Sequence, residues 1–129
     1  MSGYTILNLK DLEDMAAKFG RTGYEARFAT KPLGLEKSGL GYQKLQPNHR
    51  MDFGHTHDVQ EEVFIVVNGS GRVKLDDEVR DLKTWDAVRV PKEVMRGFEA
   101  GPDGMELLIF GAPHTEKNDA QLERDWWTD

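Results

Sequence analysis

Between residues 25 and 110 the chain is a succession of short segments rich in strand-forming residues, each bounded by residues that favour turns. The turn sequences Asn68-Gly69, Asp76-Asp77 and Gly101-Pro102-Asp103-Gly104 each suit a reversal of the chain. Short strands at such intervals are typical of a sandwich or barrel, so the pattern predicts an all-β fold. The predicted strands are Glu25–Ala29, Leu40–Leu45, Arg50–His57, Glu61–Val67, Arg72–Leu75, Val79–Leu82, Ala87–Val90, Arg96–Ala100 and Glu106–Phe110.

The first twenty residues follow a different pattern, with apolar side chains at helical spacing. Asn8 can cap a short helix at its start and Gly20 can end it. The apolar positions are Leu9, Leu12, Met15, Ala16 and Phe19. We therefore expect an N-terminal extension with a short helix at residues 1–24, a barrel at residues 25–112 and a polar C-terminal tail at residues 113–129.

Length, net charge and residue composition exclude several classes of partner and site. A chain of 129 residues fits one domain, and a net charge of -6 leaves no excess of Lys and Arg to neutralise phosphates, which argues against nucleic acid as a partner. No apolar segment is long enough to span a bilayer and the N-terminus lacks the apolar core of a signal peptide, so we expect a cytoplasmic protein with no membrane partner. Because the chain has no cysteine, a metal site must rest on His and carboxylate.

The stretch His55-Thr56-His57, followed by Glu62 at the start of a strand-forming run, predicts such a site. In a strand, residues two apart share a face, so His55 and His57 can converge on one ion, and Glu62 can add an oxygen from the next strand. Glu61 competes for that role, but it has the opposite parity and should face outward. Two imidazoles and one carboxylate with open positions suit a divalent transition metal (Fe, Mn, Ni, Cu or Zn).

The spacing H-x-H-x4-E-x6-G, from His55 to Gly69, resembles the first motif of the cupins. The second cupin motif is similar to residues 85–100, in which Pro91 and the spacing are kept and Arg96 stands where a fourth ligand histidine is usual. The resemblance, which covers roughly residues 40–110, implies a double-stranded β-helix, a jelly-roll barrel whose central pocket binds a divalent metal. It also implies candidate metal-dependent enzyme chemistries (dioxygenase, isomerase or lyase), without assigning catalytic residues.

Strand parity predicts which side chains line that pocket. Phe53 shares a face with His55 and His57, Phe64 shares one with Glu62, and Arg96 shares one with Phe98. With Tyr42 added, the predicted ligand-binding residues form a largely apolar cavity with a few polar groups, which is typical of a small-molecule site. These residues are Arg96, Tyr42, Phe53, Phe64 and Phe98.

Arg96 separates two hypotheses. In the first, His55, His57 and Glu62 hold the metal, and Arg96 binds the carboxylate or phosphate of a small organic ligand. In the second, Arg96 pairs with Glu62, no metal binds, and the barrel is a binding or sensing module for a small molecule, because a guanidinium can neutralise a buried carboxylate as a metal would.

The last expectation concerns assembly. Exposed edge strands favour association, and Trp126-Trp127 at the end of a polar tail is costly to leave in water. We therefore expect a homodimer in which the tail packs on a barrel, either its own or that of the partner.

Overall fold

The structure is a computed structural model that describes residues 3–51, 53–57, 61–111, 120–124 and 126–128, with residues 53–57 and 120–124 described by their backbone alone. Strands dominate it, and the all-β prediction is confirmed. The helices are a 3-10 turn at Leu9–Asp11, α1 at Met15–Lys18 and α2 at Thr30–Leu33. The strands are β1 Tyr24–Phe28, β2 Gly39–Leu45, β3 Phe53–His57, β4 Glu62–Leu75, β5 Glu78–Lys83, β6 Ala87–Val90, β7 Arg96–Gly111 and β8 Ala120–Arg124.

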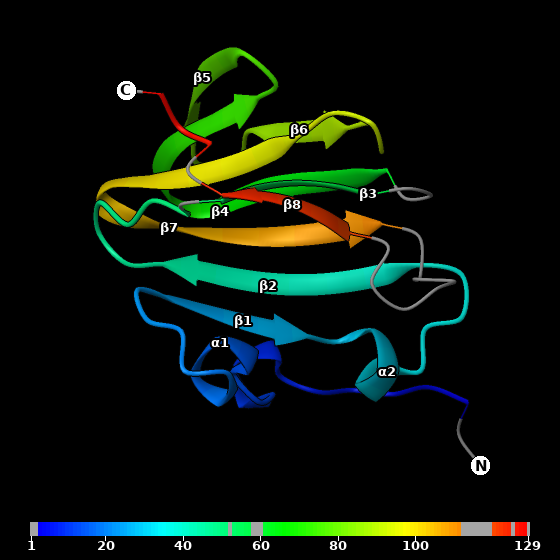
Figure 1. Ribbon diagram of the computed structural model, residues 1–129. Coiled ribbons are helices and arrows are strands. Elements are labelled where there is room, and N and C mark those ends of the chain that lie inside the picture. The colour runs from blue at the N-terminus through cyan, green and yellow to red at the C-terminus, as the bar shows by residue number, and fades with distance from the viewer. Residues whose placement is uncertain (1–2, 52, 58–60, 112–119, 125, 129) are drawn as a thin grey trace.

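Antiparallel pairing arranges these strands in two sheets that share the long strands β4 and β7. The first sheet has the order β1, β2, β7 (residues 105–111), β4 (residues 62–69) and β6. The second sheet has the order β8, β3, β7 (residues 96–100), β4 (residues 71–75) and β5. Figure 1 shows β4 and β7 running through the middle of the molecule, with α1 beside β1 at one end and β5 at the other. This two-sheet arrangement is the predicted jelly roll.

The prediction of a reversal at Asn68-Gly69 is wrong, because β4 continues through both residues. The ladder with β7 shifts its register between Val66 and Asn68 and again between Gly69 and Gly71, so the chain bulges and bends instead of turning back. Gly69 has φ +78°, and a Cβ placed on it would lie 2.1 Å from the carbonyl oxygen of Gly104. Only glycine leaves room for the backbones of Gly69 and Gly104 to approach this closely.

The prediction of a reversal at Gly101-Pro102-Asp103-Gly104 is wrong for the same reason. β7 runs from Arg96 to Gly111 without turning back, and Gly104 has φ +80°. By contrast, Asp76-Asp77 does form the predicted turn: it joins β4 to β5, with Leu75 paired to Glu78 and Asp76 at φ 51°. Turn residues thus mark both bulges and reversals in this chain.

The N-terminal helix is present but divided. Asn8 caps the 3-10 turn through the backbone N–H of Lys10, as its position predicted. The chain then leaves helical geometry, and Asp14 caps α1 by accepting a hydrogen bond from Ala16 N at 3.0 Å. The same carboxylate oxygen accepts a hydrogen bond from Ala26 N of β1, also at 3.0 Å. Asp14 therefore ties α1 to the edge of the first sheet.

The core lies between the inner faces of the two sheets. Paired residues share a face, so the register places Leu45 with Met105 and Phe64 with Ile109 in the first sheet, and Val73 with Phe98 in the second. These positions are buried or pack against the buried cluster, which consists of Leu45, Met51, Phe64, Val66, Val73, Leu82, Val90, Phe98, Ala100, Met105 and Leu107. In the part of the chain that the structure describes, no helix is long and apolar enough to cross a membrane.

Candidate functional site

Arg96 is the most deeply buried charged residue that the structure describes, with 0% of its side chain exposed. Its Nη1 donates to Glu62 Oε1 at 2.8 Å, and its Nη2 donates to the carbonyl oxygens of Pro91 at 2.6 Å and Val94 at 2.8 Å. Nε also donates to the Val94 carbonyl, at 3.1 Å. Of the five N–H groups of a guanidinium, this leaves one, on Nη1, beyond these four bonds. The face of Arg96 that could grip a ligand carboxylate in a bidentate way is therefore bound to the protein itself.

The ion pair of Arg96 and Glu62 joins the two sheets. Glu62 begins β4 in the first sheet, paired with Val90 and Gly111, and its side chain is 12% exposed. Arg96 begins β7 in the second sheet, paired with Leu75 and His55. Burial lowers the pKa of Arg96 by more than the charge and hydrogen bond of Glu62 raise it, so this pKa lies below its ordinary value. The carboxylate therefore offsets only part of the desolvation of the guanidinium.

Phe64 and Phe98 lie together in the interior, one from each sheet. Their ring centroids are 4.7 Å apart at an interplanar angle of 46°, and each residue is 3% exposed. Phe64 shares its face of β4 with Glu62, and Phe98 shares its face of β7 with Arg96. The structure thus brings four of the predicted site residues to one side of their strands.

The side chains of His55, His57 and Phe53 lie outside the described part of the structure, so their predicted roles stay predictions. Their backbone forms β3, in which His55 stands opposite Arg96 in the ladder. Among the side chains that are described, His, Asp and Glu form no group of three that could hold a metal ion. Glu61 lies at the surface beside Arg89, 3.1 Å from its Nη2, as the parity argument predicted.

Tyr42 lies apart from the other predicted ligand-binding residues. It pairs with Leu108 and Arg27, whereas the inward positions of the same strands are Leu45, Leu107 and Ala26. Its hydroxyl donates a hydrogen bond to Glu106, and burial together with that bond raises the pKa of Tyr42. Tyr42 is therefore buried on the outer face of the first sheet, beneath Lys10 of the N-terminal segment.

No sequence pattern predicted the polar cluster around Glu106. Tyr42 from β2 and Asn68 from the bulge of β4 both donate to its carboxylate, the latter at 2.7 Å, and Lys10 lies 3.5 Å away. The hydrogen bond from Tyr42 lowers the pKa of Glu106, and Asn68 and Lys10 lower it further. Together these contributions outweigh burial, which raises the pKa. Since the donors are far apart in sequence, only the register of the strands brings them together.

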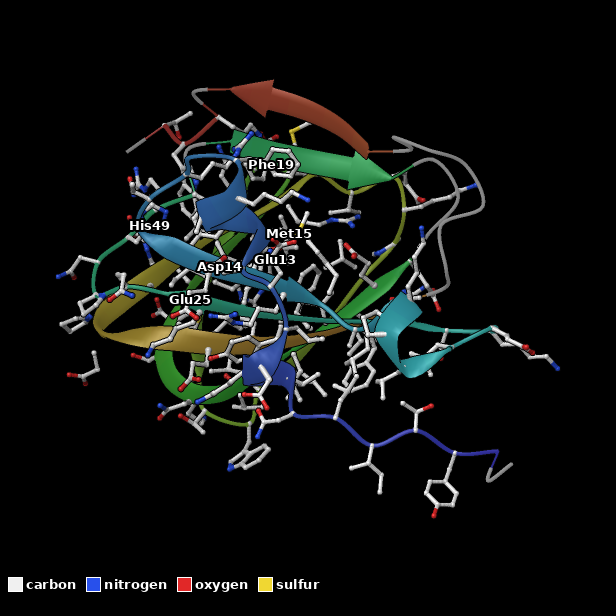
Figure 2. The ribbon with its side chains drawn as sticks, turned by 90° about the horizontal axis from the view of Figure 1, so that it is seen from below. Glu13, Asp14, Met15, Phe19, Glu25 and His49 are labelled. Carbon is white, nitrogen blue, oxygen red and sulfur yellow. The ribbon has the colours of Figure 1, made fainter. Side chains whose placement is uncertain are left out.

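A cleft of about 220 Å³ opens between α1 and the inner face of β1. Its lining is mostly apolar and includes Met15 of α1, Phe19 at the C-cap of α1, Phe28 of β1 and Met51. Figure 2 looks onto this face and labels Met15 of α1, Phe19 at the C-cap of α1, and His49 beside the start of β1. The ring of His49 stacks on Tyr24, with 5.7 Å between the ring centroids. Because Met51 also belongs to the core, the cleft reaches the interior of the fold.

Comparison with known proteins places these features in a family. The model of the cupin domain family matches residues 41–110, more than half of the chain. The protein SchB of Streptomyces halstedii is 29% identical over 92 residues, which are 70% of this chain and 66% of that protein, slightly less than two thirds of its length.

Two solved structures have the same fold. The polyketide cyclase RemF from Streptomyces resistomycificus superposes with a TM-score of 0.73 at 18% identity, covering 97% of this chain and 87% of that one. The nucleoside dehydratase Pac13 superposes with a TM-score of 0.71 at 17% identity, covering 96% of this chain and 92% of that one. At such identities the likeness concerns the fold alone.

Proposed function

We propose that this chain, which belongs to the cupin domain family, binds a small organic molecule between its two sheets and does so without a metal at Glu62. The observation that carries the proposal is the buried ion pair of Arg96 and Glu62, 2.8 Å apart. Burying two charges is costly even when they are paired, so such a pair is weak evidence for stability alone. The pair shares its faces of β4 and β7 with the buried rings of Phe64 and Phe98. Apolar surface and a fixed polar group thus lie on the same side of each strand, a combination typical of small-molecule sites.

The donor set does not fit a divalent metal while this pair persists. Glu62 is the only oxygen ligand of the predicted set, and its Oε1 already accepts a hydrogen bond from a guanidinium that stays protonated at any ordinary pH. A dication held by the same carboxylate would be repelled by that cation across an interior of low dielectric constant. Arg96 thus supplies the positive charge that a metal would otherwise provide.

A metal centre is the second candidate, and the register of β3 favours it. Because His55 stands opposite Arg96 in the ladder, the strand that carries His55 and His57 runs beside the partner of Glu62. If Arg96 released Glu62, then His55, His57 and Glu62 would be the ligands of Fe, Mn, Ni, Cu or Zn, which would make the protein a metal-dependent enzyme of dioxygenase, isomerase or lyase type. In that arrangement Arg96 would be free to orient an anionic ligand.

The ligand we propose is a compact molecule with at least one planar ring. The rings of Phe64 and Phe98 contact each other in the interior, and a planar ligand that packed beside them would add aromatic contacts to the apolar area that it buries. The cleft beneath α1 is a route of suitable size, since an apolar cavity of about 150 Å³ already admits benzene and this one is about 220 Å³. A variant of Streptomyces Pac13, which has the same fold, is known with uridine, so uridine is a sensible first probe.

Elemental analysis of tag-free protein separates the two candidates. After dialysis against Mn, Fe, Ni, Cu and Zn in turn, we expect less than one-tenth equivalent of tightly bound metal. One equivalent of metal that is lost in Glu62→Gln and kept in the matched control Glu61→Gln would establish the second candidate instead. Titration with uridine and 2-naphthoate, followed by NMR, should shift the ring resonances of Phe64 and Phe98. If neither probe shifts them, the proposed binding site is wrong.

We also propose that the protein is a homodimer, because β1 and β6 end the first sheet without a further described strand partner. Light scattering at micromolar concentration should give twice the chain mass of 14.7 kDa. A single-chain mass would contradict this.

A further inference from the structure

We infer that Trp126 and Trp127 form a C-terminal latch that positions β3, the strand carrying His55 and His57. The inference rests on the proposed function in one respect only, namely that β3 borders the ligand site. The latch itself is argued from the contacts of the two tryptophans on the outer face of the second sheet.

Trp127 is fixed by one hydrogen bond and two cations. Its Nε1 donates to the carbonyl oxygen of Met51 at 2.8 Å. The guanidinium carbons of Arg50 and Arg72 lie 4.4 Å and 5.5 Å from its ring centroid, within the range of cation–π attraction. The indole is therefore held both through its N–H group and through the face of its ring.

Glu99 holds the two arginines in place for this contact. Its Oε2 accepts from Arg50 Nε at 2.6 Å, and its Oε1 accepts from Arg72 Nε at 2.9 Å and Nη2 at 2.6 Å. Burial alone would raise the pKa of Glu99, but the hydrogen bonds and charges of Arg50 and Arg72 outweigh it and lower that pKa. Glu99 therefore holds the side chains of Arg50 and Arg72 in the positions that contact Trp127. This reduces the side-chain entropy that the two arginines lose when the indole packs against them.

Trp126 is fixed by Lys74. The ammonium of Lys74 lies 4.5 Å from the ring centroid of Trp126 and donates a hydrogen bond to the carbonyl oxygen of the same residue. Lys74 is 4% exposed, which is rare for a lysine without a partner. The tail thus covers this ammonium and also satisfies it.

The strand before this anchor is what holds β3. All five residues of β3, Phe53 to His57, are paired with β8 at Ala120–Arg124, whereas one of them, His55, is also paired with β7, at Arg96. β8 lies alongside β3 in Figure 1 and leads toward the latch. Just before the start of β3, Met51 donates its N–H to Phe98 O, and its own carbonyl oxygen accepts a hydrogen bond from Trp127 Nε1. Releasing the tryptophans would therefore loosen β3 at its start and along its length.

Backbone hydrogen exchange in the ligand-free protein tests the latch without reference to any ligand. We expect Trp127→Ala to raise the exchange rates of residues 53–57 and 120–124 roughly tenfold or more, from the loss of one hydrogen bond and two cation–π contacts. The amides of Val66 and Phe98 in the shared strands should keep their protection. Trp127→Phe retains a ring for the arginines and should fall in between. The exposed Trp85 provides the matched control, since Trp85→Ala should leave β3 unchanged.

Equal loss of protection in β3 and in the shared strands would mean that Trp127 only supports global stability, and unchanged exchange in β3 would mean that no latch exists. Either result overturns the inference. Uridine titration of wild-type protein and Trp127→Ala then adds the functional arm. If uridine binds the wild type, its affinity should drop at least fivefold in the variant, and equal affinities would refute the positioning role. If uridine does not bind the wild type, the proposed binding function fails in that form, while the exchange result still decides the latch.

Discussion

The guanidinium of Arg96 and the carboxylate of Glu62 meet 2.8 Å apart across the interface between two sheets, and neither group is more than 12% exposed. Removing one partner of a buried pair leaves the other charge without compensation, so Arg96→Met and Glu62→Leu should each lower the free energy of unfolding by about 3–5 kcal/mol. The double variant should lose much less than the sum of the two, because no buried charge remains. Urea unfolding of the three variants measures this, and simple additivity would show that the pair is not coupled.

Because the Tyr42 hydroxyl is buried and donates to Glu106, the free energy of unfolding should fall at alkaline pH. The pKa of Tyr42 is raised above its ordinary value of 10.0, so the folded protein keeps a proton that the unfolded chain loses. Its stabilising contribution is complete below pH 10 and declines by about 1.4 kcal/mol per pH unit above it. Tyr42→Phe should be less stable at neutral pH by about 1–3 kcal/mol but should lack this decline. Thermal unfolding between pH 8 and pH 11 compares the two proteins; identical slopes would contradict the assignment.

Glu99 predicts the opposite dependence at acidic pH. Its pKa is lowered from the ordinary value of 4.5, so its contribution is present above pH 4.5 and is lost as the pH falls through the lower folded value. Glu99→Gln should therefore be less stable at pH 7, and the difference from wild type should shrink below pH 4.5. Glu78, which is 63% exposed beside Arg80, is the matched control, and Glu78→Gln should change stability little at any pH.

Gly69 and Gly20 separate steric from conformational effects, because both have a positive φ, +78° and +72°. A Cβ at Gly20 would meet no atom within 4 Å, so Gly20→Ala should cost about 1–2 kcal/mol from the left-handed backbone alone. At Gly69 the Cβ would collide with the carbonyl of Gly104, so Gly69→Ala should cost several kcal/mol more or prevent folding. Comparable stabilities of the two variants would indicate that the bulge can move.

The parts of the fold that could be predicted from the sequence are those set by local pattern. The strand Ala87–Val90 has its predicted bounds, and the parity argument correctly separated the buried Glu62 from the exposed Glu61. Asn68-Gly69 misled because a bulge and a hairpin turn need the same positive φ, and only the partner strand decides between them. The division of the N-terminal helix also depended on a distant group, since Asp14 binds Ala26 of β1 as well as α1.

The candidate site was predictable only in part. The pairing of Arg96 with Glu62 was one of the two hypotheses drawn from the sequence, whereas Tyr42 lies apart from the predicted site. Pro91, Val94 and Glu62 converge on Arg96 through backbone carbonyls and a long-range ion pair, and no sequence pattern identifies which carbonyl oxygens a buried arginine will use. Strand β8 was missed for a similar reason, because its pairing with β3 joins parts of the chain far apart in sequence. The placement of Tyr42 with Glu106 required knowledge of which face of β2 is covered by the N-terminal segment.

The continuous pairing of β4 with β7 has a consequence for how the molecule reaches its native state. Their partners are nearest in sequence at Leu75 and Arg96 and farthest at Glu62 and Gly111, so closing the ladder costs least loop entropy at the first end and most at the second. Folding should begin around the hairpin at Asp76-Asp77, and the pairing of β4 with β7 should then extend toward Glu62. Val73 and Phe98 should be native-like in the transition state, whereas Phe64 and Ile109 should become ordered later. Arg96 lies at the end of the ladder that pairs first, and Glu62 lies at the end that pairs last. Their ion pair would therefore be among the last contacts to form, so the site would be completed only once the barrel is closed.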